Sequence, residues 1–180
     1  PMLKDRNVWI ISYGFFAGFA IIIGLTAILT PLLLSLGFTV EPGFGSPVIV
    51  ETLILAFGIV GAIVISAISD KVQKRKPFLI FAIFVGALAT LVLGISTILV
   101  LTFVFATILG FSLTSVMPVA LSTLEEFKSV GPRLSGASAG LAFELGNLGG
   151  LVGTILLDAL KDTSTGSYLL SILFLFVAVL

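Results

Sequence analysis

The sequence contains no cysteine and no histidine, and only 10% of its 180 residues are charged. Without cysteine there are no disulfide bonds and no thiolate chemistry, and without histidine there is no imidazole metal site and no serine–histidine dyad. Soluble domains carry about 25% charged residues, so this shortage of charge argues against a surface that faces water. The net charge is zero, which gives no sign of a nucleic-acid partner. We expect no metal and no cofactor.

Hydrophobic residues make up 58% of the chain and lie in long runs between short charged connections. A helix that spans a bilayer needs roughly 20 apolar residues, and six segments meet or approach that length. The second of them begins with Ser46-Pro47, a typical helix-start signal. The sequence therefore predicts an all-α, multi-pass membrane protein, surrounded by lipid, with six transmembrane helices at residues 8–36, 47–69, 78–95, 98–124, 134–157 and 167–180.

The basic residues mark one side of the membrane. Every Lys and Arg except Lys161 lies before the first predicted span, between the second and third, or between the fourth and fifth. Positively charged loops stay on the cytoplasmic side, so we predict that both termini are cytoplasmic. The chain begins at Pro1 and stops within an apolar run at Leu180, which we interpret as a part of a longer protein.

The connection between the second and third predicted spans carries the most specific motif. Residues 66–77 form a short basic loop led by one acid. This loop resembles the motif Gly-x-x-x-Asp-Arg/Lys-x-Gly-Arg/Lys-Arg/Lys of the major facilitator superfamily, although Ser66 and Gln73 replace its two glycines. Degenerate copies of this kind are common in the C-terminal half of that family. The residues at the matching places are Asp70, Lys71, Lys74 and Arg75.

Two further segments are similar to the same family, so the resemblance covers the whole chain. Residues 3–9 resemble the approach to its seventh helix, and residues 117–153 resemble its tenth and eleventh helices. The resemblance implies the C-terminal six helices, seven to twelve, of a twelve-helix protein, built as two inverted three-helix repeats. It also implies a secondary active transporter in a prokaryotic plasma membrane, which moves a small polar solute by alternating access together with a missing N-terminal six-helix half.

The resemblance gives the basic loop a role as a gate. It implies that Asp70 accepts hydrogen bonds from the N-terminus of a helix in the opposite half. Lys71, Lys74 and Arg75 would pair with nearby acids, and these contacts would exist only when the cytoplasmic side is closed. A plain cytoplasmic cluster of positive charge is the simpler alternative. The acids available for such pairs are Glu125 and Glu126, in the connection after the fourth span.

Glu144 is predicted near the middle of the fifth span, where an ionisable group is costly and suggests a function by default. No Lys or Arg lies at that depth. One interpretation is that Glu144, with Asn147, contacts the substrate or couples transport to protons. The other is a protonated or hydrogen-bonded Glu at a helix contact, because Gly136, Gly140 and Asn147 follow the same helical stripe. The sequence leaves both interpretations open.

Small and polar residues provide the remaining candidates. Gly136-xxx-Gly140 and Gly149-xxx-Gly153 have the spacing that lets helix backbones approach closely. Glu51 would complement the positive end of the second helix. By the resemblance, the first and fourth helices line the central cavity, where Pro31 and Pro118 would bend them. Thr and Ser side chains in membrane helices more often donate a hydrogen bond to a backbone carbonyl of their own helix than bind a ligand. The candidates for substrate contact in these two helices are Tyr13, Phe16, Phe19, Thr26, Thr30, Thr107, Ser112, Thr114 and Ser115.

An enzyme is disfavoured because the spans contain no paired carboxylates and every Lys lies in a loop or at an end. Two alternatives to the twelve-helix transporter stay open. One is a self-standing six-span transporter that acts as a homodimer. The other is a channel or a structural membrane protein, although the chain has no Asn-Pro pair of the kind that marks re-entrant half-helices.

Overall fold

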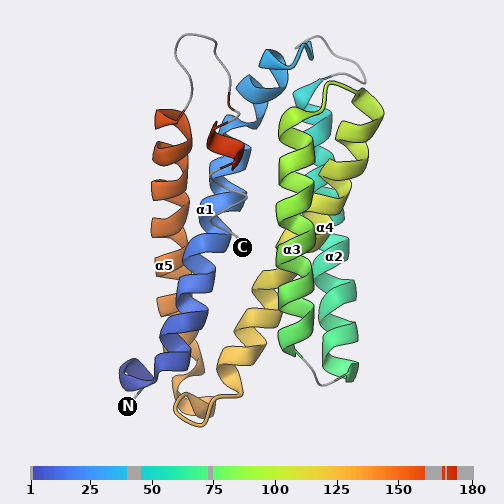
Figure 1. Ribbon diagram of the computed structural model, residues 1–180. Coiled ribbons are helices and arrows are strands. Elements are labelled where there is room, and N and C mark those ends of the chain that lie inside the picture. Colours follow the sequence, from blue (N-terminus) through green and yellow to red (C-terminus); the bar gives the residue numbers. More distant parts are fainter. Residues whose placement is uncertain (1, 40–45, 73–74, 161–167, 169, 174–180) are drawn as a thin grey trace.

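The computed structural model describes residues 2–39, 46–72, 75–160, 168 and 170–173. After a short 3-10 helix at Met2–Lys4, these residues form the five long helices of Figure 1. All five are long and apolar enough to cross a membrane. Their bounds agree within three residues with the first five predicted spans. The helices are α1 (Arg6–Ser35), α2 (Pro47–Val72), α3 (Arg75–Ile95), α4 (Leu99–Glu125) and α5 (Gly131–Ala159).

Local sequence signals explain where α1 begins and ends. Asp5 caps its N-terminus and accepts a hydrogen bond of 2.9 Å from the backbone N–H of Asn7. At the other end Gly37 adopts a left-handed conformation with φ of 94°, and the N–H of Phe38 donates to the carbonyl of Leu33. This is the Schellman arrangement, whose left-handed residue is most often glycine because glycine has no Cβ. The helix continues through Pro31, and α4 continues through Pro118.

Consecutive helices run in opposite directions, so the connections gather at two ends of the bundle (Figure 1). The N-terminus, the end of α2, the start of α3 and the α4–α5 connection lie at one end, at the bottom of Figure 1. Lys and Arg residues lie in and beside these connections, so we call this end of the bundle the basic end. Of the sixth predicted span, 167–180, only residues 168 and 170–173 are described, and they lie near the opposite end (Figure 1).

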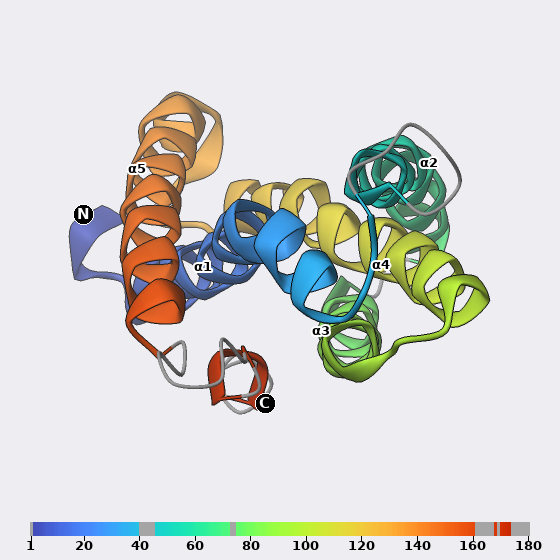
Figure 2. The same cartoon turned by 90° about the horizontal axis from the view of Figure 1, so that it is seen from above.

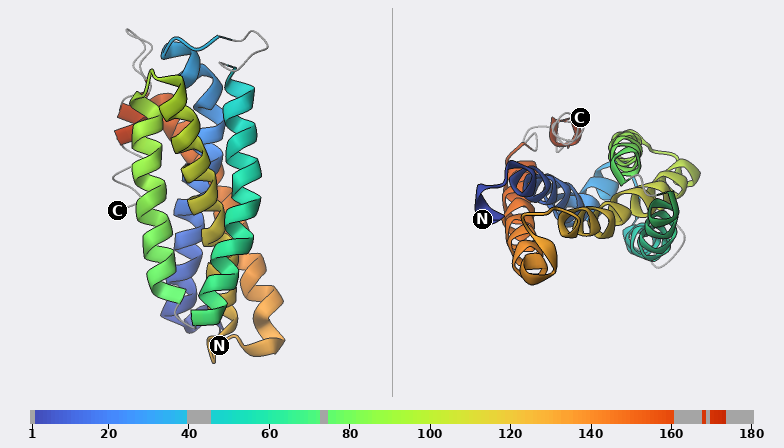
Figure 3. Two further views of the ribbon diagram at one scale, coloured as in Figure 1. Left: turned by 90° about the vertical axis from the view of Figure 1, so that its right-hand side faces the viewer. Right: turned by 90° about the horizontal axis from the view of Figure 1, so that it is seen from below.

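The five helices form two packing groups. In the first group α1 packs mainly against α5, and in the second group α2 and α3 pack mainly against α4. The views along the bundle in Figures 2 and 3 show α1 and α4 in the middle, with α5 on one side and α2 and α3 on the other. The two groups touch each other much less than their members do. Buried apolar side chains join them in two clusters, and Val8, Leu124 and Val130 belong to the one near the basic end.

Glycine allows the closest approach inside each group. A Cβ on Gly149 or Gly153 of α5 would overlap the backbone carbonyls of Phe16 and Ala20 in α1. Likewise, a Cβ on Gly61 would overlap the carbonyl of Phe111, and one on Gly110 would overlap that of Ile54. Backbone is therefore in contact with backbone at both helix pairs, as small residues permit in membranes.

Candidate functional site

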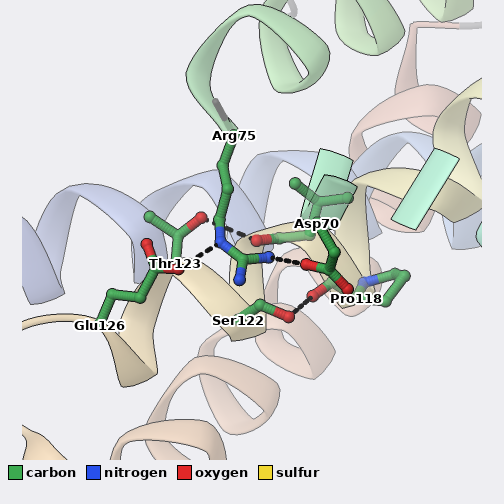
Figure 4. A network of polar contacts seen from close by, with 7 residues as sticks. Asp70, Arg75, Pro118, Ser122, Thr123 and Glu126 are labelled. Carbon is green, nitrogen blue, oxygen red and sulfur yellow. Dashed lines mark hydrogen bonds and ion pairs between the residues drawn. The ribbon is translucent and has the colours of Figure 1, made fainter. Parts of the chain in front are cut away.

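Arg75 joins the ends of three helices at the basic end (Figure 4). Asp70 lies in the last turn of α2, Arg75 opens α3, and Glu126 directly follows α4. The Nη1 atom of Arg75 lies 2.8 Å from Oδ1 of Asp70, and its Nε atom lies 2.7 Å from Oε1 of Glu126. We call these three residues the Arg75 cluster. One planar guanidinium thus binds two carboxylates at once, which an ammonium group does less well.

The central cation of this cluster is largely buried, and the two acids are exposed to solvent. The side chain of Arg75 is 18% exposed, whereas those of Asp70 and Glu126 are 58% and 59% exposed. Burial acts to lower the pKa of Arg75, but the hydrogen bond to Glu126 and the charges of both carboxylates outweigh it and raise that pKa above its ordinary value. Arg75 therefore stays positively charged. The exposure of the acids keeps each pair weak enough to break, because solvent and salt screen it.

Helix dipoles oppose the positions of Asp70 and Arg75. A helix C-terminus favours a cation and a helix N-terminus favours an anion, each by about 0.3–1 kcal/mol. Asp70 is an acid at the end of α2, and Arg75 is a base at the start of α3. Neither residue stabilises its own helix, and the ion pair between Asp70 and Arg75 offsets both unfavourable interactions with the helix dipoles. Such residues are better explained by the pair that they form than by helix stability.

Polar groups of α2 and α4 surround the Arg75 cluster. The hydroxyls of Ser122 and Thr123 donate to the carbonyls of Pro118 and Val119 in their own helix, at 2.9 and 2.7 Å (Figure 4). In α2, the hydroxyl oxygens of Ser66 and Ser69 are buried and have no hydrogen-bond partner within the described part of the chain. The Arg75 cluster is thus the charged edge of a polar region where α2 and α4 meet.

A comparison with protein families identifies the kind of protein. The model of the Major Facilitator Superfamily matches residues 1–154. The chain belongs to this superfamily. It is also 30% identical over 161 residues to an uncharacterized protein of Archaeoglobus fulgidus, and that match covers 89% of this chain and 71% of the relative. The chain is therefore part of an integral, multi-pass membrane protein of a transporter superfamily.

The structure brings together part of the superfamily motif predicted from the sequence. Asp70 and Arg75 meet, and Glu126 supplies the nearby acid that was expected for one of the bases. Lys71 is exposed at the end of α2, while Lys74 lies outside the described residues. The contact of Asp70 with a helix of the opposite half stays a prediction.

Glu144 lies on the face of α5 that is turned away from α1. The same face carries Gly136, Gly140 and Asn147, all of them exposed. Within the described residues, Glu144 has no hydrogen-bond or ion-pair partner, and a Cβ on Gly136 or Gly140 would meet nothing within 4 Å. The predicted stripe exists, and its residues are exposed rather than packed against another of the described helices. The close backbone contacts of α5 occur instead at Gly149 and Gly153.

The predicted cavity residues do not gather at one place. Thr26, Thr107 and Ser112 donate to carbonyls of their own helices at 2.9, 2.9 and 2.7 Å. Thr107 and Ser112 line a crevice between α2, α3 and α4, whereas Tyr13, 69% exposed and stacked on Phe16, lines a groove of α1, α3 and α4. Ser115, too, bonds a carbonyl of α4, that of Ser112.

Within the described part of the chain, Thr30 is the one predicted cavity residue whose side chain forms a hydrogen bond to another helix. Its hydroxyl donates to Oε1 of Glu51 at 3.0 Å and so joins α1 to α2 one residue before Pro31. Glu51 therefore does more than complement the start of α2. No sequence signal pointed to this pair, because the two residues are 21 positions apart on different helices.

One cavity between helices offers a polar solute few hydrogen-bonding partners. It has a volume of about 220 Å³ between α1, α3 and α4, and its walls are apolar side chains and glycines. Among the described residues, no group of three or more acidic side chains suits a metal ion. The Arg75 cluster is therefore the strongest candidate for a functional role in the described part of the chain.

Proposed function

We propose that this chain is one six-helix half of a secondary active transporter that moves a small polar solute by alternating access, and that the Arg75 cluster holds its cytoplasmic side closed. The observation that carries the proposal is the bridge from Arg75 to Asp70 and Glu126, which ties the ends of α2, α3 and α4 together. Alternating access requires contacts that form in one state and break in the other. Partly exposed ion pairs at helix ends have the moderate strength that such a contact needs.

The charge distribution supports a cytoplasmic location for the Arg75 cluster. The N-terminus and the α2–α3 and α4–α5 connections carry or adjoin several bases, among them Lys4, Arg6, Lys71, Arg75, Lys128 and Arg133. These connections share one end of the bundle (Figure 1). Loops rich in Lys and Arg stay in the cytoplasm. We therefore assign the basic end to the cytoplasmic side of a prokaryotic plasma membrane.

The packing of the helices supports two inverted three-helix repeats. In this arrangement α1, α2 and α3 form one repeat, and α4, α5 and the sixth predicted span form the other. The first helix of each repeat then packs on the second helix of the other, because α1 packs on α5 and α4 packs on α2. Both pairs use glycines in direct contact with a backbone carbonyl. Such reciprocal packing is what an inverted repeat produces.

The outward face of α5 supports a partner half. Glu144 and Asn147 are exposed halfway along a membrane span, and lipid is a costly environment for a carboxylate. Gly136 and Gly140 on the same face leave room for a close helix. We assign this face to the contact with the second six-helix unit, either the N-terminal half or a second copy. Glu144 then bonds a polar group of that unit and has no role in proton coupling.

Replacing Glu144 by glutamine tests this assignment. A glutamine keeps the size and the hydrogen-bonding capacity of the side chain, so we expect transport with an unchanged pH profile. Leucine at the same position removes the hydrogen bond and should lower the free energy of unfolding of the intact protein by about 1 kcal/mol. The melting temperature should then fall by a few degrees. A flattened pH profile in Glu144→Gln would instead assign proton coupling to this residue.

The transport proposal itself is tested by reconstitution. A thermal-shift screen of the intact protein against small metabolites identifies a solute, because only a ligand of the native state raises the melting temperature. Saturable counterflow of that solute in liposomes is expected. A linear, non-saturating flux would favour a channel and would contradict the proposal.

A further inference from the structure

Asp5 uses its two carboxylate oxygens for two different contacts. Oδ1 caps α1 by accepting from the backbone N–H of Asn7 at 2.9 Å. Oδ2 accepts a hydrogen bond from the hydroxyl of Ser129, which is 124 positions away in the sequence. The bonds from Ser129 and Asn7 lower the pKa of Asp5, so the acceptor is an ionised carboxylate. Hydrogen bonds to ionised acceptors are about twice as strong as neutral ones.

Ser129 lies in the tight turn that also carries Glu126. This turn joins α4 to α5, and the N–H groups of Val130 and Gly131 both donate to the carbonyl of Phe127, each at 3.0 Å. Gly131 leaves the turn with a φ of 53°, a left-handed conformation that glycine adopts without strain. Only Phe127 and Lys128 lie between Glu126 and Ser129, so such a turn leaves little freedom between them. A force that holds Ser129 therefore also sets the position of Glu126.

The same turn is the covalent link between the two packing groups at the basic end. It begins at α4 of the second group and ends at α5 of the first group, while Asp5 precedes α1 of the first group. Contacts between the groups are sparse. The bond between Asp5 and Ser129 therefore connects the start of α1 to a segment whose other end takes part in the Arg75 cluster.

We propose that Asp5 is a positioning residue for the gate: its bond to Ser129 fixes the turn that presents Glu126 to Arg75. The inference rests on the proposed role of the Arg75 cluster in closing the cytoplasmic side. When the start of α1 moves away from the turn, the Asp5–Ser129 bond breaks and Glu126 loses its fixed position. The movement of α1 and the opening of the Arg75 cluster are then coupled through the backbone between Ser129 and Glu126.

Burial of Val130 is the rival explanation for the position of the turn. Val130 is 3% exposed and packs in the apolar cluster that contains Val8 and Leu124. If this burial alone held the turn, loss of the Ser129 hydroxyl would leave Glu126 in place. Substitutions at Ser129 separate the two explanations, because they leave Val130 untouched.

The test uses a reporter cysteine at Thr123 in the intact protein, in a background without other cysteines. The 180 residues contribute none. Thr123 is 9% exposed and lies beside Arg75 and Glu126 (Figure 4), so its labelling by a membrane-impermeant maleimide in inside-out vesicles reports opening of the cytoplasmic side. We expect Ser129→Ala to raise the labelling rate about threefold, the effect of losing one hydrogen bond. Ser129→Thr, which keeps the hydroxyl, should label at the wild-type rate.

The control and the double variant make the outcome decisive. Ser138→Ala removes a hydroxyl that donates within α5, to the carbonyl of Ser135, and should leave the rate unchanged. In the Arg75→Gln background, Ser129→Ala should add nothing, because the contact that it positions is already lost. A wild-type rate in Ser129→Ala, or an effect that adds to Arg75→Gln, would overturn the inference alone. A wild-type rate in Arg75→Gln would contradict the proposed gate and this inference with it.

Discussion

Arg75→Gln is expected to open the cytoplasmic side of the transporter. The substitution removes the cation from between Asp70 and Glu126 and leaves two carboxylates that repel each other. Partly exposed ion pairs contribute about 0.5 kcal/mol each, so losing both, about 1 kcal/mol in total, shifts the balance between closed and open states by roughly fivefold. The labelling rate of a cysteine at position 123 should rise by that factor. Counterflow of the solute should fall, because the inward-closed state is populated less.

Two further variants show whether charge or geometry matters. Lys128→Gln removes an equal charge from the same end of the bundle at an exposed position, and its labelling rate should stay near that of the wild type. Arg75→Lys keeps the charge but loses the planar fork that reaches two acids, so an intermediate rate is expected. If Lys128→Gln had the same effect as Arg75→Gln, the Arg75 cluster would be no more than a part of the general positive charge.

Gly149→Ala is expected to cause a large loss of stability for the addition of a single methyl group. The added Cβ would overlap the carbonyl oxygen of Phe16, and backbone atoms cannot turn aside as a flexible side chain can. The helices α1 and α5 would have to separate, at a cost of about 2 kcal/mol. The melting temperature of the intact protein in detergent, followed by the fluorescence of Trp9, should fall by about 5 °C.

Gly18→Ala is the matched control for this loss. Gly18 also lies inside a membrane helix, but a Cβ there would meet nothing within 4 Å. Alanine is the better helix former by up to about 1 kcal/mol, so Gly18→Ala should be neutral or slightly stabilising. Equal melting temperatures for the two variants would contradict the close contact between α1 and α5.

The membrane spans were predictable because their signals are local. An uninterrupted apolar run and a short charged connection can be recognised from neighbouring residues, and Asp5 and Pro47 mark helix starts by their chemistry. The five described helices accordingly lie within three residues of the predicted spans. The pairing of a loop base with Glu126 was also accessible, since both lie in connections on the same predicted side of the membrane.

The glycine contacts were only half predictable. Gly136-xxx-Gly140 and Gly149-xxx-Gly153 have identical spacing, and spacing says that small residues share a face without saying which face meets a neighbour. In the folded chain Gly149 and Gly153 lie against α1, whereas Gly136 and Gly140 are exposed, with no other side chain or helix within 4 Å of a Cβ built on them. The same limit applied to the hydroxyl groups. Thr26 and Thr107 resemble Thr30 in the sequence, but only the position of α2 gives Thr30 the partner Glu51.

The sequence by itself determined that this protein is an α-helical membrane protein and which residues form five of its helices, because hydropathy, caps and loop charge act over short stretches of chain. Only the tertiary structure decided that α1 pairs with α5 and α2 with α4. It also decided which charges meet: Arg75 and Glu126 are 51 positions apart, and Asp5 and Ser129 are 124 apart. Such contacts depend on how closely backbones can pack, and that is a property of pairs of helices rather than of any one segment.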